Sequence, residues 1–508
     1  MNNPEKITRT IFIAATVLSA VLFTAKVGIA QRADSAAIPV DLEDNGQDRI
    51  VTVKQAVEIA LANNTQMKQA LLSVKDADQQ VLSAWGEVMP SISSDMSYTR
   101  NMEIPVNFIP ARVFDPSAPA GQLVPVQFGT DNNWSGGITI NQTLFSGQAL
   151  VGISSSAVYK LVQSENYRAT SQQIVTQTRI AYYNVLIAEE RLSLQQASIR
   201  RLEKNLKENQ ARQRAGLLDE YDVLRVEVQL SNQRPQLTQA EYAVSKAYRE
   251  LKITMGLPLE FDFRVEGNLR EYNLSDRSSA DSVNASLKSL DTMTPLVLDP
   301  SIGLTEKAFD LRGDLRILDA RDELTDRQLL AARSRYFPSL SASYQLRWNA
   351  SERGDPNFFA SDRQRARSQA ISLSFSLPLF QGMQRHTAVQ RAQIQEKEIA
   401  LQRENARRAA KNEIQSARES IRQALETEEA RIKALRQARR GYEIANTRLD
   451  QGIGSQLDVT NAEIQYREAE LNYAVMVFNY LRAKARYDQA LGMVPFVDKT
   501  TNPIEEGQ

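Results

Sequence analysis

Two apolar series, each repeating every seven residues, run along the segment from Ile453 to Tyr487. They are Leu457, Ile464, Leu471, Phe478 and Ala485, and Val459, Tyr466, Tyr473, Tyr480 and Tyr487. The series are two residues apart, which is about 200° around a helix, so the pattern predicts a helix packed against a neighbour on each side. The segment from Leu217 to Leu251 has a matching series, Val223, Leu230, Leu237, Val244 and Leu251. Long helices buried on two flanks can close into a hollow cylinder, which is typical of a conduit rather than a catalyst.

Alternation of apolar and polar residues predicts four β-strands, over about 91–102, 134–145, 339–349 and 370–379. One face of each strand is apolar, and the other is mainly serine, threonine, asparagine and glutamine. Runs of this length suit tilted strands that cross a bilayer, and serine suits a wet lumen. A soluble antiparallel sandwich is the alternative interpretation. Because about eight strands is the usual minimum for a closed barrel, four strands per chain predict an oligomer.

The chain is internally duplicated. Gly216 and Gly452 are 236 residues apart, and so are Asp222 and Asp458. Each half reads as helix, strand, strand, long helix, long helix. The first repeat spans 51–258, with long helices over about 148–214 and 219–255, and the second spans 304–495, with long helices over about 383–450 and 455–491. A Ser/Asp-rich linker, 259–303, joins them, and a C-terminal tail, 496–508, follows.

The N-terminus has Lys6 and Arg9 before an apolar run, and small residues precede Gln31. This order predicts a signal peptide over 1–30, followed by an N-terminal tail over 31–50, in an exported protein. A single membrane-anchoring helix is the alternative, but the apolar run is shorter than the ~20 residues that a span needs.

Composition and charge exclude several kinds of chemistry. Basic and acidic residues are balanced at 61 each, so nothing indicates nucleic-acid binding. The chain has no cysteine and one histidine, His386, which leaves no metal-ligand cluster of the usual kind. We find no nucleophile with a convergent base and no phosphate-binding glycine loop, and therefore expect neither an enzyme nor a bound cofactor.

The chain resembles the TolC family of outer-membrane efflux proteins. The resemblance covers residues 50 to 495 and lies in an ordered set of short motifs rather than in one strong motif. These are Val53-Lys54-Gln55-Ala56 to Asn63-Asn64, Val88-Met89-Pro90-Ser91-Ile92, Thr143-Leu144-Phe145-Ser146-Gly147, Tyr336-Phe337-Pro338-Ser339-Leu340, Leu377-Pro378-Leu379-Phe380-Gln381-Gly382, and Gly452 to Asp458-Val459.

The resemblance implies a mostly α protein with a membrane β-barrel. It implies a homotrimeric 12-stranded β-barrel in the outer membrane of a Gram-negative bacterium, continuous with a long periplasmic α-helical barrel. The implied partners are a periplasmic adaptor (membrane fusion) protein and an inner-membrane RND or ABC transporter. The implied function is the passive exit duct of a tripartite efflux or type I secretion system. A periplasmic coiled-coil scaffold or structural envelope protein without transport is the alternative, and the sequence does not indicate the exported substrate.

The resemblance also indicates functional residues. The periplasmic entrance would hold Asp222 and Asp458, with Asp219 and Glu220 beside them, as acidic rings that favour cations. The alternative is that Asp222 and Asp458 serve only the positive ends of helix dipoles. The adaptor would dock on the hairpin turns at Gly216, Leu217, Gly452, Ile453 and Gly454. The swivels between helices and strands would be Pro90, Pro338, Gly147, Pro378 and Gly382.

Two positions depart from the family pattern. Gly454 stands where the family's best-studied member has an arginine that ties the closed state together, and Asn461 stands where that member has a second aspartate. Another arrangement must therefore hold the gate closed, and the candidates are Arg212, Arg214 or Arg448 with Asp219 and Glu220. Pro235 is expected to kink the helix over 219–255, which is the second long helix of the first repeat. The proline-rich segment 103–133 is expected to be a loop.

Overall fold

The computed structural model describes residues 49–274, 284–294, 296, 298, 302–355 and 365–497. The expected signal peptide, nearly all of the N-terminal tail, and the C-terminal tail beyond Val497 lie outside the described residues, as does part of the expected linker.

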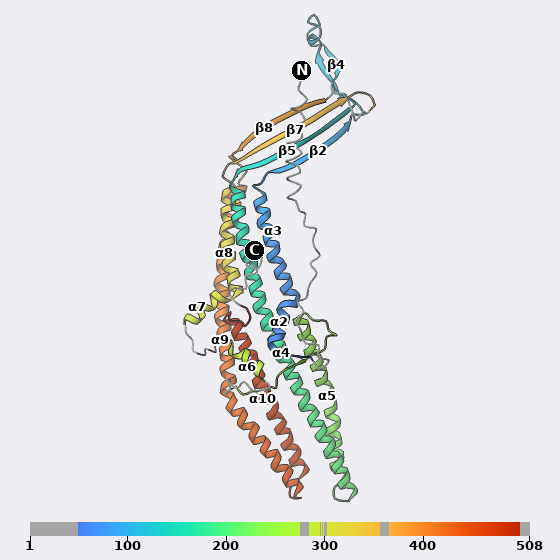
Figure 1. Ribbon diagram of the computed structural model, residues 1–508, viewed down its shortest axis with the longest axis vertical. Coiled ribbons are helices and arrows are strands. Elements are labelled where there is room, and N and C mark those ends of the chain that lie inside the picture. The colour runs from blue at the N-terminus through green and yellow to red at the C-terminus, as the bar shows by residue number, and fades with distance from the viewer. Residues whose placement is uncertain are drawn as a thin grey trace, which may run out of the picture. The chain divides into compact units, whose positions relative to one another are not determined.

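Four long strands form one antiparallel sheet in the order β2-β5-β7-β8 (Figure 1). They are β2 (Ser91–Arg100), β5 (Asn132–Ser146), β7 (Ser339–Glu352) and β8 (Arg365–Ser376). A bulge between Thr143 and Phe145 shifts the pairing of β5 with β7. The two halves of the duplicated chain therefore meet at the centre of one sheet, where β5 of the first half pairs with β7 of the second.

The register gives the sheet one apolar and one polar face. Ile92, Ile140, Tyr344 and Ile371 are aligned across the four strands, and every second residue of a strand shares a face. The next row along is Ser91, Asn141, Ser343 and Ser372, on the opposite face. Large side chains of the apolar face are exposed in the single chain, with Ile371 at 83% and Met96 at 84%. The sheet is therefore a surface that still needs an apolar environment.

The segment between β2 and β5 contains regular structure that we did not expect. Residues 103–133 were expected to be a loop, but β3 (Val106–Pro110) and β4 (Leu123–Gln127) pair as an antiparallel hairpin. The short helix η1 (Ala111–Val113) begins the connection between them. The prolines at 110 and 125 lie in this hairpin. Both strands of a two-stranded sheet are edge strands, and proline is tolerated in edge strands.

Two helical hairpins account for most of the chain. In the first, α4 (Gly147–Arg214) pairs with α5 (Glu220–Met255), and in the second, α9 (Gln384–Asp450) pairs with α10 (Gln456–Ala490). α10 also packs against α4, which joins the hairpins. Nearer the sheet, α3 (Thr65–Gly86) packs on α4, and α8 (Gly313–Ser334) packs between α4 and α9. α5 runs through Pro235 as one helix.

Each half was expected to begin with a single helix, but in both halves the structure has two helices there, which corrects the expectation. The first pair is α2 (Val53–Asn63) and α3, and the second pair is α7 (Ile302–Leu311) and α8. Each break receives the end of a return helix. A Cβ atom on Gly256 would lie 2.5 Å from the carbonyl oxygen of Asn63, and one on Gly492 would lie 2.6 Å from the carbonyl carbon of Leu311.

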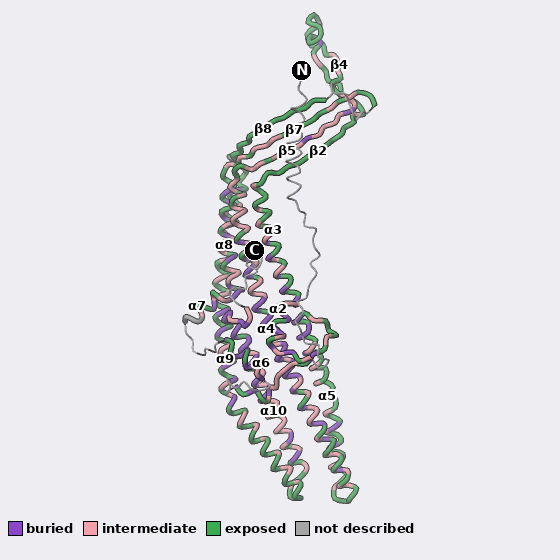
Figure 2. The backbone as a smooth tube through the Cα atoms, viewed as in Figure 1, coloured by how far each residue is buried: buried purple, intermediate pink, exposed green. Residues whose placement is uncertain are grey.

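A belt of shorter segments covers the middle of the hairpins. We define the belt as the described residues between 259 and 298. It includes β6 (Arg264–Val265), which pairs in parallel with β1 (Ile50–Val51), and α6 (Ala285–Thr292). Figure 2 shows buried residues gathered where these segments meet the long helices, whereas the sheet is mostly exposed. Within the ranges that the structure describes, no helix is both long and apolar enough to cross a membrane.

Candidate functional site: hairpin tips, swivels and the seam

The two hairpin turns have the same geometry. Gly216 and Gly452 end α4 and α9 in the left-handed conformation, with φ of 70° and 74°. The N–H groups of Leu217 and Ile453 donate to the carbonyls of Arg212 and Arg448, at 2.9 and 3.0 Å. Both side chains are exposed, at 76% and 74%. Each tip therefore presents one apolar side chain immediately after its glycine.

Gly454 is a glycine because the turn folds back onto α9. A Cβ atom at this position would lie 3.0 Å from the Cβ of Arg448 and 3.0 Å from the backbone nitrogen of Leu449. A larger side chain would have to push the turn away from the helix end. In this turn the side chain of Arg448 therefore lies close to the backbone of residue 454.

The acidic residues that were expected at the entrance lie at the starts of α5 and α10. Asp458 forms a capping box with Ser455, and its backbone N–H donates to the Ser455 hydroxyl at 3.2 Å. The hydrogen bonds from Ser455 hold the pKa of Asp458 below its ordinary value, and the charge of Arg448 adds to this. Asp219 is the N-cap of α5, while Glu220 and Asp222 lie in its first turn. Within the described chain, none of these acidic residues forms an ion pair with Arg212, Arg214 or Arg448.

One predicted swivel residue of the first half, Gly147, lies against the helix end that precedes Pro338 in the second half. A Cβ atom on Gly147 would lie 3.3 Å from both Phe337 and Ser334, so the start of α4 packs against the end of α8. The guanidinium of Arg385 donates to the carbonyl of Pro378 at 2.7 Å and lies 4.7 Å from the ring centre of Tyr336. Gly382, with φ of 56°, precedes α9. The end of β8 is therefore fastened to the helix-to-strand turn before β7.

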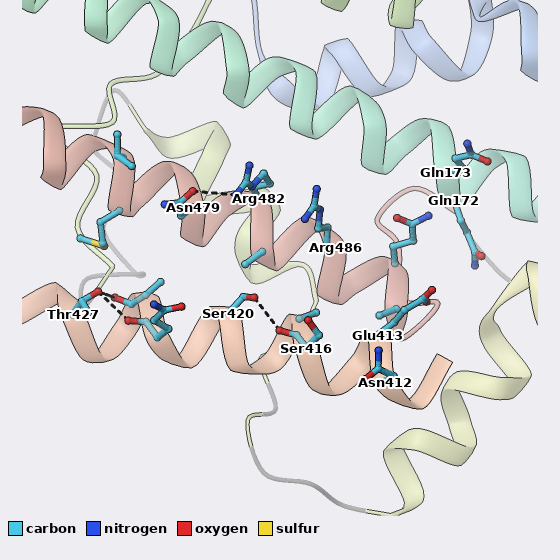
Figure 3. Close-up of a pocket in the computed structure, with 18 of the residues that line it drawn as sticks. Gln172, Gln173, Asn412, Glu413, Ser416, Ser420, Thr427, Asn479, Arg482 and Arg486 are labelled. Atoms are coloured by element: carbon cyan, nitrogen blue, oxygen red, sulfur yellow. Dashed lines mark hydrogen bonds between the residues drawn. The ribbon is translucent and has the colours of Figure 1, made fainter. Parts of the chain in front are cut away.

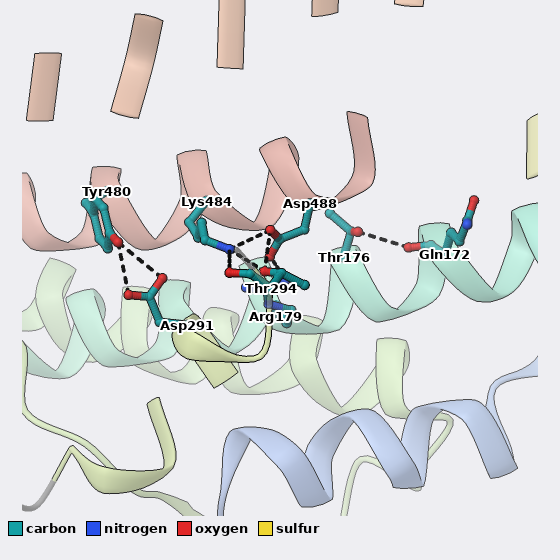
Figure 4. A network of polar contacts seen from close by, with 8 residues as sticks. All are labelled: Gln172, Thr176, Arg179, Asp291, Thr294, Tyr480, Lys484 and Asp488. Atoms are coloured by element: carbon teal, nitrogen blue, oxygen red, sulfur yellow. Dashed lines mark hydrogen bonds and ion pairs between the residues drawn. The ribbon is translucent and has the colours of Figure 1, made fainter. Parts of the chain in front are cut away.

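Sequence reasoning missed a row of charge bridges between α4 and α10, which we call the seam. Its first bridge is buried at belt level (Figure 4). Arg179 and Asp488 form an ion pair at 2.7 Å, both 1% exposed, and Lys484 pairs with the same carboxylate at 2.6 Å. The Thr294 hydroxyl of the belt donates to Asp488 at 2.7 Å. Burial lowers the pKa of Lys484, and the charge of Asp488 opposes that shift.

Two further bridges lie closer to the tips. Arg270 of the belt contacts Glu190 of α4 at 2.6 Å and Glu470 of α10 at 3.6 Å. Arg201 of α4 donates directly to Glu463 of α10 at 2.9 Å. On α4 the three bridging residues, at 179, 190 and 201, recur every eleven residues, which is about three helical turns. That spacing of charges within an apolar pattern is the signal that could have revealed the seam.

The chain has a sheet at one end, two helical hairpins at the other and a belt around the middle. This is the architecture of a component of an outer-membrane duct. The sequence model for "Outer membrane efflux protein" matches residues 56–257 and 304–493, and the chain belongs to this family. The chain is similar to outer membrane protein TolC of Salmonella enteritidis, being 24% identical over 375 residues, which are 71% of this chain and 69% of TolC.

Solved structures show the same fold. The CmeC outer membrane channel of Campylobacter jejuni superimposes with a TM-score of 0.71 at 18% identity, covering 89% of this chain and 88% of CmeC. The open state of the MtrE outer membrane channel of Neisseria gonorrhoeae gives a TM-score of 0.65 at 18% identity, covering 87% and 88%. The protein is an outer-membrane efflux duct that extends into the periplasm, and its family is one of channels.

Proposed function

We propose that three copies of the chain join their sheets edge to edge into one closed sheet of twelve strands. The observation that carries this proposal is the pair of free edges. β2 and β8 are the two ends of the strand order, and every residue of both is exposed. An exposed edge with an apolar face invites pairing with another chain. Three copies pair β8 of one chain with β2 of the next, which removes the edges and places the apolar face against lipid.

The same assembly makes a helical tube below the sheet. Near the tips the helices of one chain follow the order α5, α4, α10, α9, and α9 of one subunit then meets α5 of the next. The tube passes solutes passively and draws on an inner-membrane RND or ABC transporter for energy. A periplasmic adaptor docks on the tips, where Leu217 and Ile453 offer exposed apolar anchors on equivalent turns.

We propose that the seam, rather than the arginines near the tips, holds the closed state within each subunit. Two of the bridges join α4 to α10 without a belt residue between them. Of these two, the bridge between Arg201 and Glu463 lies nearer the tips. Opening breaks this bridge and separates α10 from α4 between the tips and the belt. Asp222 and Asp458 then form two acidic rings at the entrance, six carboxylates in all, which attract cations.

Conductance in planar bilayers tests the duct and its entrance. The purified trimer is measured as wild type and as Asp222→Ala/Asp458→Ala, with Asp262→Ala as the control because Asp262 lies in the belt with its side chain 99% exposed. Small cation-selective steps that lose their selectivity only in the double variant are expected. Failure to form trimers or channels would refute the duct assembly, and unchanged selectivity in a conducting double variant would refute the acidic entrance.

A further inference from the structure

A large polar groove lies between α9 and α10 and reaches α4 (Figure 3). Its volume is about 860 Å³. Gln172 and Gln173 of α4 lie at one side, and Arg312 at the start of α8 closes one end. Ser416, Ser420 and other residues of α9 form the opposite wall. The groove is large enough for an organic solute of moderate size.

The groove faces away from the belt. The belt contacts of α10 include Tyr480, which donates to Asp291 at 2.9 Å, and Lys484, which donates to the Thr294 carbonyl at 3.3 Å. Arg482 lies two residues from each of them, about 200° around the helix, and lines the groove. The belt is therefore a second layer on one side of the layer of long helices that includes α10. In the trimer that we propose, this second layer is on the outside, so the groove opens into the lumen.

The charge of the groove is positive and uncompensated. Its two carboxylates, Asp314 and Glu413, both bind Arg312, at 2.7 and 2.8 Å. The other three arginines, Arg431, Arg482 and Arg486, also line the groove, and none of them meets a carboxylate in the part of the chain that the structure describes. Arg482 donates to the side-chain oxygen of Asn479 at 3.3 Å, and its guanidinium lies 5.2 Å from the ring centre of Phe478.

Several other arginines of α9 differ from these three in their neighbours. Arg408, Arg439 and Arg440 each pair with a glutamate three or four residues away on the same helix. The groove arginines instead have asparagine, glutamine and serine as neighbours, which add donors without cancelling charge. A planar guanidinium binds phosphate, sulfate or carboxylate through paired N–H groups. The groove therefore has the chemistry of an anion site.

We propose that this groove is a binding subsite for polyanionic solutes on their way through the duct, with Arg431, Arg482 and Arg486 as its ligands. The proposal rests on the proposed trimer, which places three such grooves around one lumen. It gives the duct two opposite electrostatic zones, an acidic entrance at the tips and a basic zone at belt level. Solutes that carry phosphate, sulfate or several carboxylate groups are the substrate class that the basic zone favours.

Calorimetric titration of the detergent-solubilised trimer with tripolyphosphate tests the proposal. The variant is Arg431→Gln/Arg482→Gln/Arg486→Gln. The matched control is Arg422→Gln, an exposed arginine of α9 that lies two residues from Ser420 and hence on the opposite side of the helix. Wild type and control are expected to bind one tripolyphosphate per subunit, and the triple variant at least tenfold more weakly. Binding should also weaken as potassium chloride is raised, because salt screens the attraction.

Bilayer recordings with tripolyphosphate added from the outer side provide the second measurement, because in the proposed duct this route to the groove does not pass the tips. Block of the wild-type and control channels, lost in the triple variant, supports the site. Equal binding and equal block in all three proteins would overturn it while leaving the duct intact. Binding lost equally in the control would show a nonspecific charge effect and would also overturn it. Absence of trimers or channels in every protein would instead contradict the proposed assembly.

Discussion

Replacement of Glu463 by glutamine is expected to open the duct. Glu463 accepts from Arg201 at 2.9 Å, and the two side chains are 5% and 27% exposed, so solvent screens this pair only in part. A hydrogen bond between charged groups contributes about 1.5–3 kcal/mol. Three subunits that open together would lose at least about 4.5 kcal/mol, which shifts the closed-to-open equilibrium roughly a thousandfold.

A second arginine adds to this effect. Burial lowers the pKa of Arg467, the charge of Glu463 raises it and the charge of Arg201 lowers it again. Without the carboxylate, two partly buried guanidinium groups face each other across the seam, and their repulsion favours separation of α10 from α4. Glutamine keeps the size and a hydrogen-bonding oxygen, so the change removes chiefly charge.

The assay is the mean conductance and open probability of single trimers in planar bilayers, with assembly checked beforehand. Glu208→Gln is the control, because Glu208 pairs at 3.8 Å with Lys204 on the same helix α4 and does not cross the seam. For a wild-type trimer that is mostly closed, the expected result is that Glu463→Gln alone raises the open probability at least about a hundredfold, or until the channel is open most of the time. A well-assembled Glu463→Gln trimer that conducts like Glu208→Gln would refute the idea that the seam holds the gate.

Three further predictions concern stability, measured by thermal unfolding of the helices in detergent. Gly256→Ala is expected to lower the free energy of unfolding by roughly 2–4 kcal/mol, because φ is 70° and the new Cβ would lie 2.5 Å from a carbonyl oxygen. Gly441→Ala is the contrasting variant. Its new Cβ would have nothing within 4 Å, so it should stabilise α9 by about 0.5–1 kcal/mol. Asp488→Ala leaves two buried cations unpaired and should lower the free energy of unfolding by roughly 3–5 kcal/mol. Lys484→Met keeps the pair of Arg179 with Asp488 and should lower it much less. Equal losses in the two variants would contradict this account. Burial raises the pKa of Glu190 more than its arginine partner lowers it, so the folded state binds the proton more tightly, and the stability from this group is lost as the pH rises through the folded pKa. Glu190→Gln should therefore raise the unfolding temperature at about pH 8 and give no gain at about pH 4; a lower temperature at pH 8 would contradict the sign.

The sequence predicted the parts of the fold that depend on local periodicity. Heptads and alternation are properties of neighbouring residues, so the long helices and the four strands could be placed to within a few residues. The break at Asn64 was missed because its cause lies 192 residues away, where Gly256 packs into it. The hairpin of β3 and β4 was missed because its prolines read as breakers, although both fit a two-stranded sheet.

The candidate site was predictable where it follows the chain and not where it crosses between helices. The glycines of the tips could be identified from sequence because a left-handed residue is needed at each helix end. The partners of Arg201 and Arg179 could not, since each bridge joins residues more than 260 positions apart. Gly454 was correctly seen as a departure, but its reason, the contact with Arg448, needed the fold of the turn.

The exposure of the seam bridges also indicates where α10 can separate from α4 when the duct opens. At belt level Arg179 and Asp488 are each 1% exposed and the belt itself binds them, while the bridge nearest the tips is 27% and 5% exposed. Water and ions reach the lower bridge more easily, so we expect separation to start at the tips and to stop at the belt. Arg482 and Arg486 flank Lys484 on α10, on the fixed side of that limit. The basic groove should therefore keep its shape while the entrance opens, and a channel opened by Glu463→Gln should bind tripolyphosphate as tightly as the wild type; weaker binding would mean that movement reaches the belt.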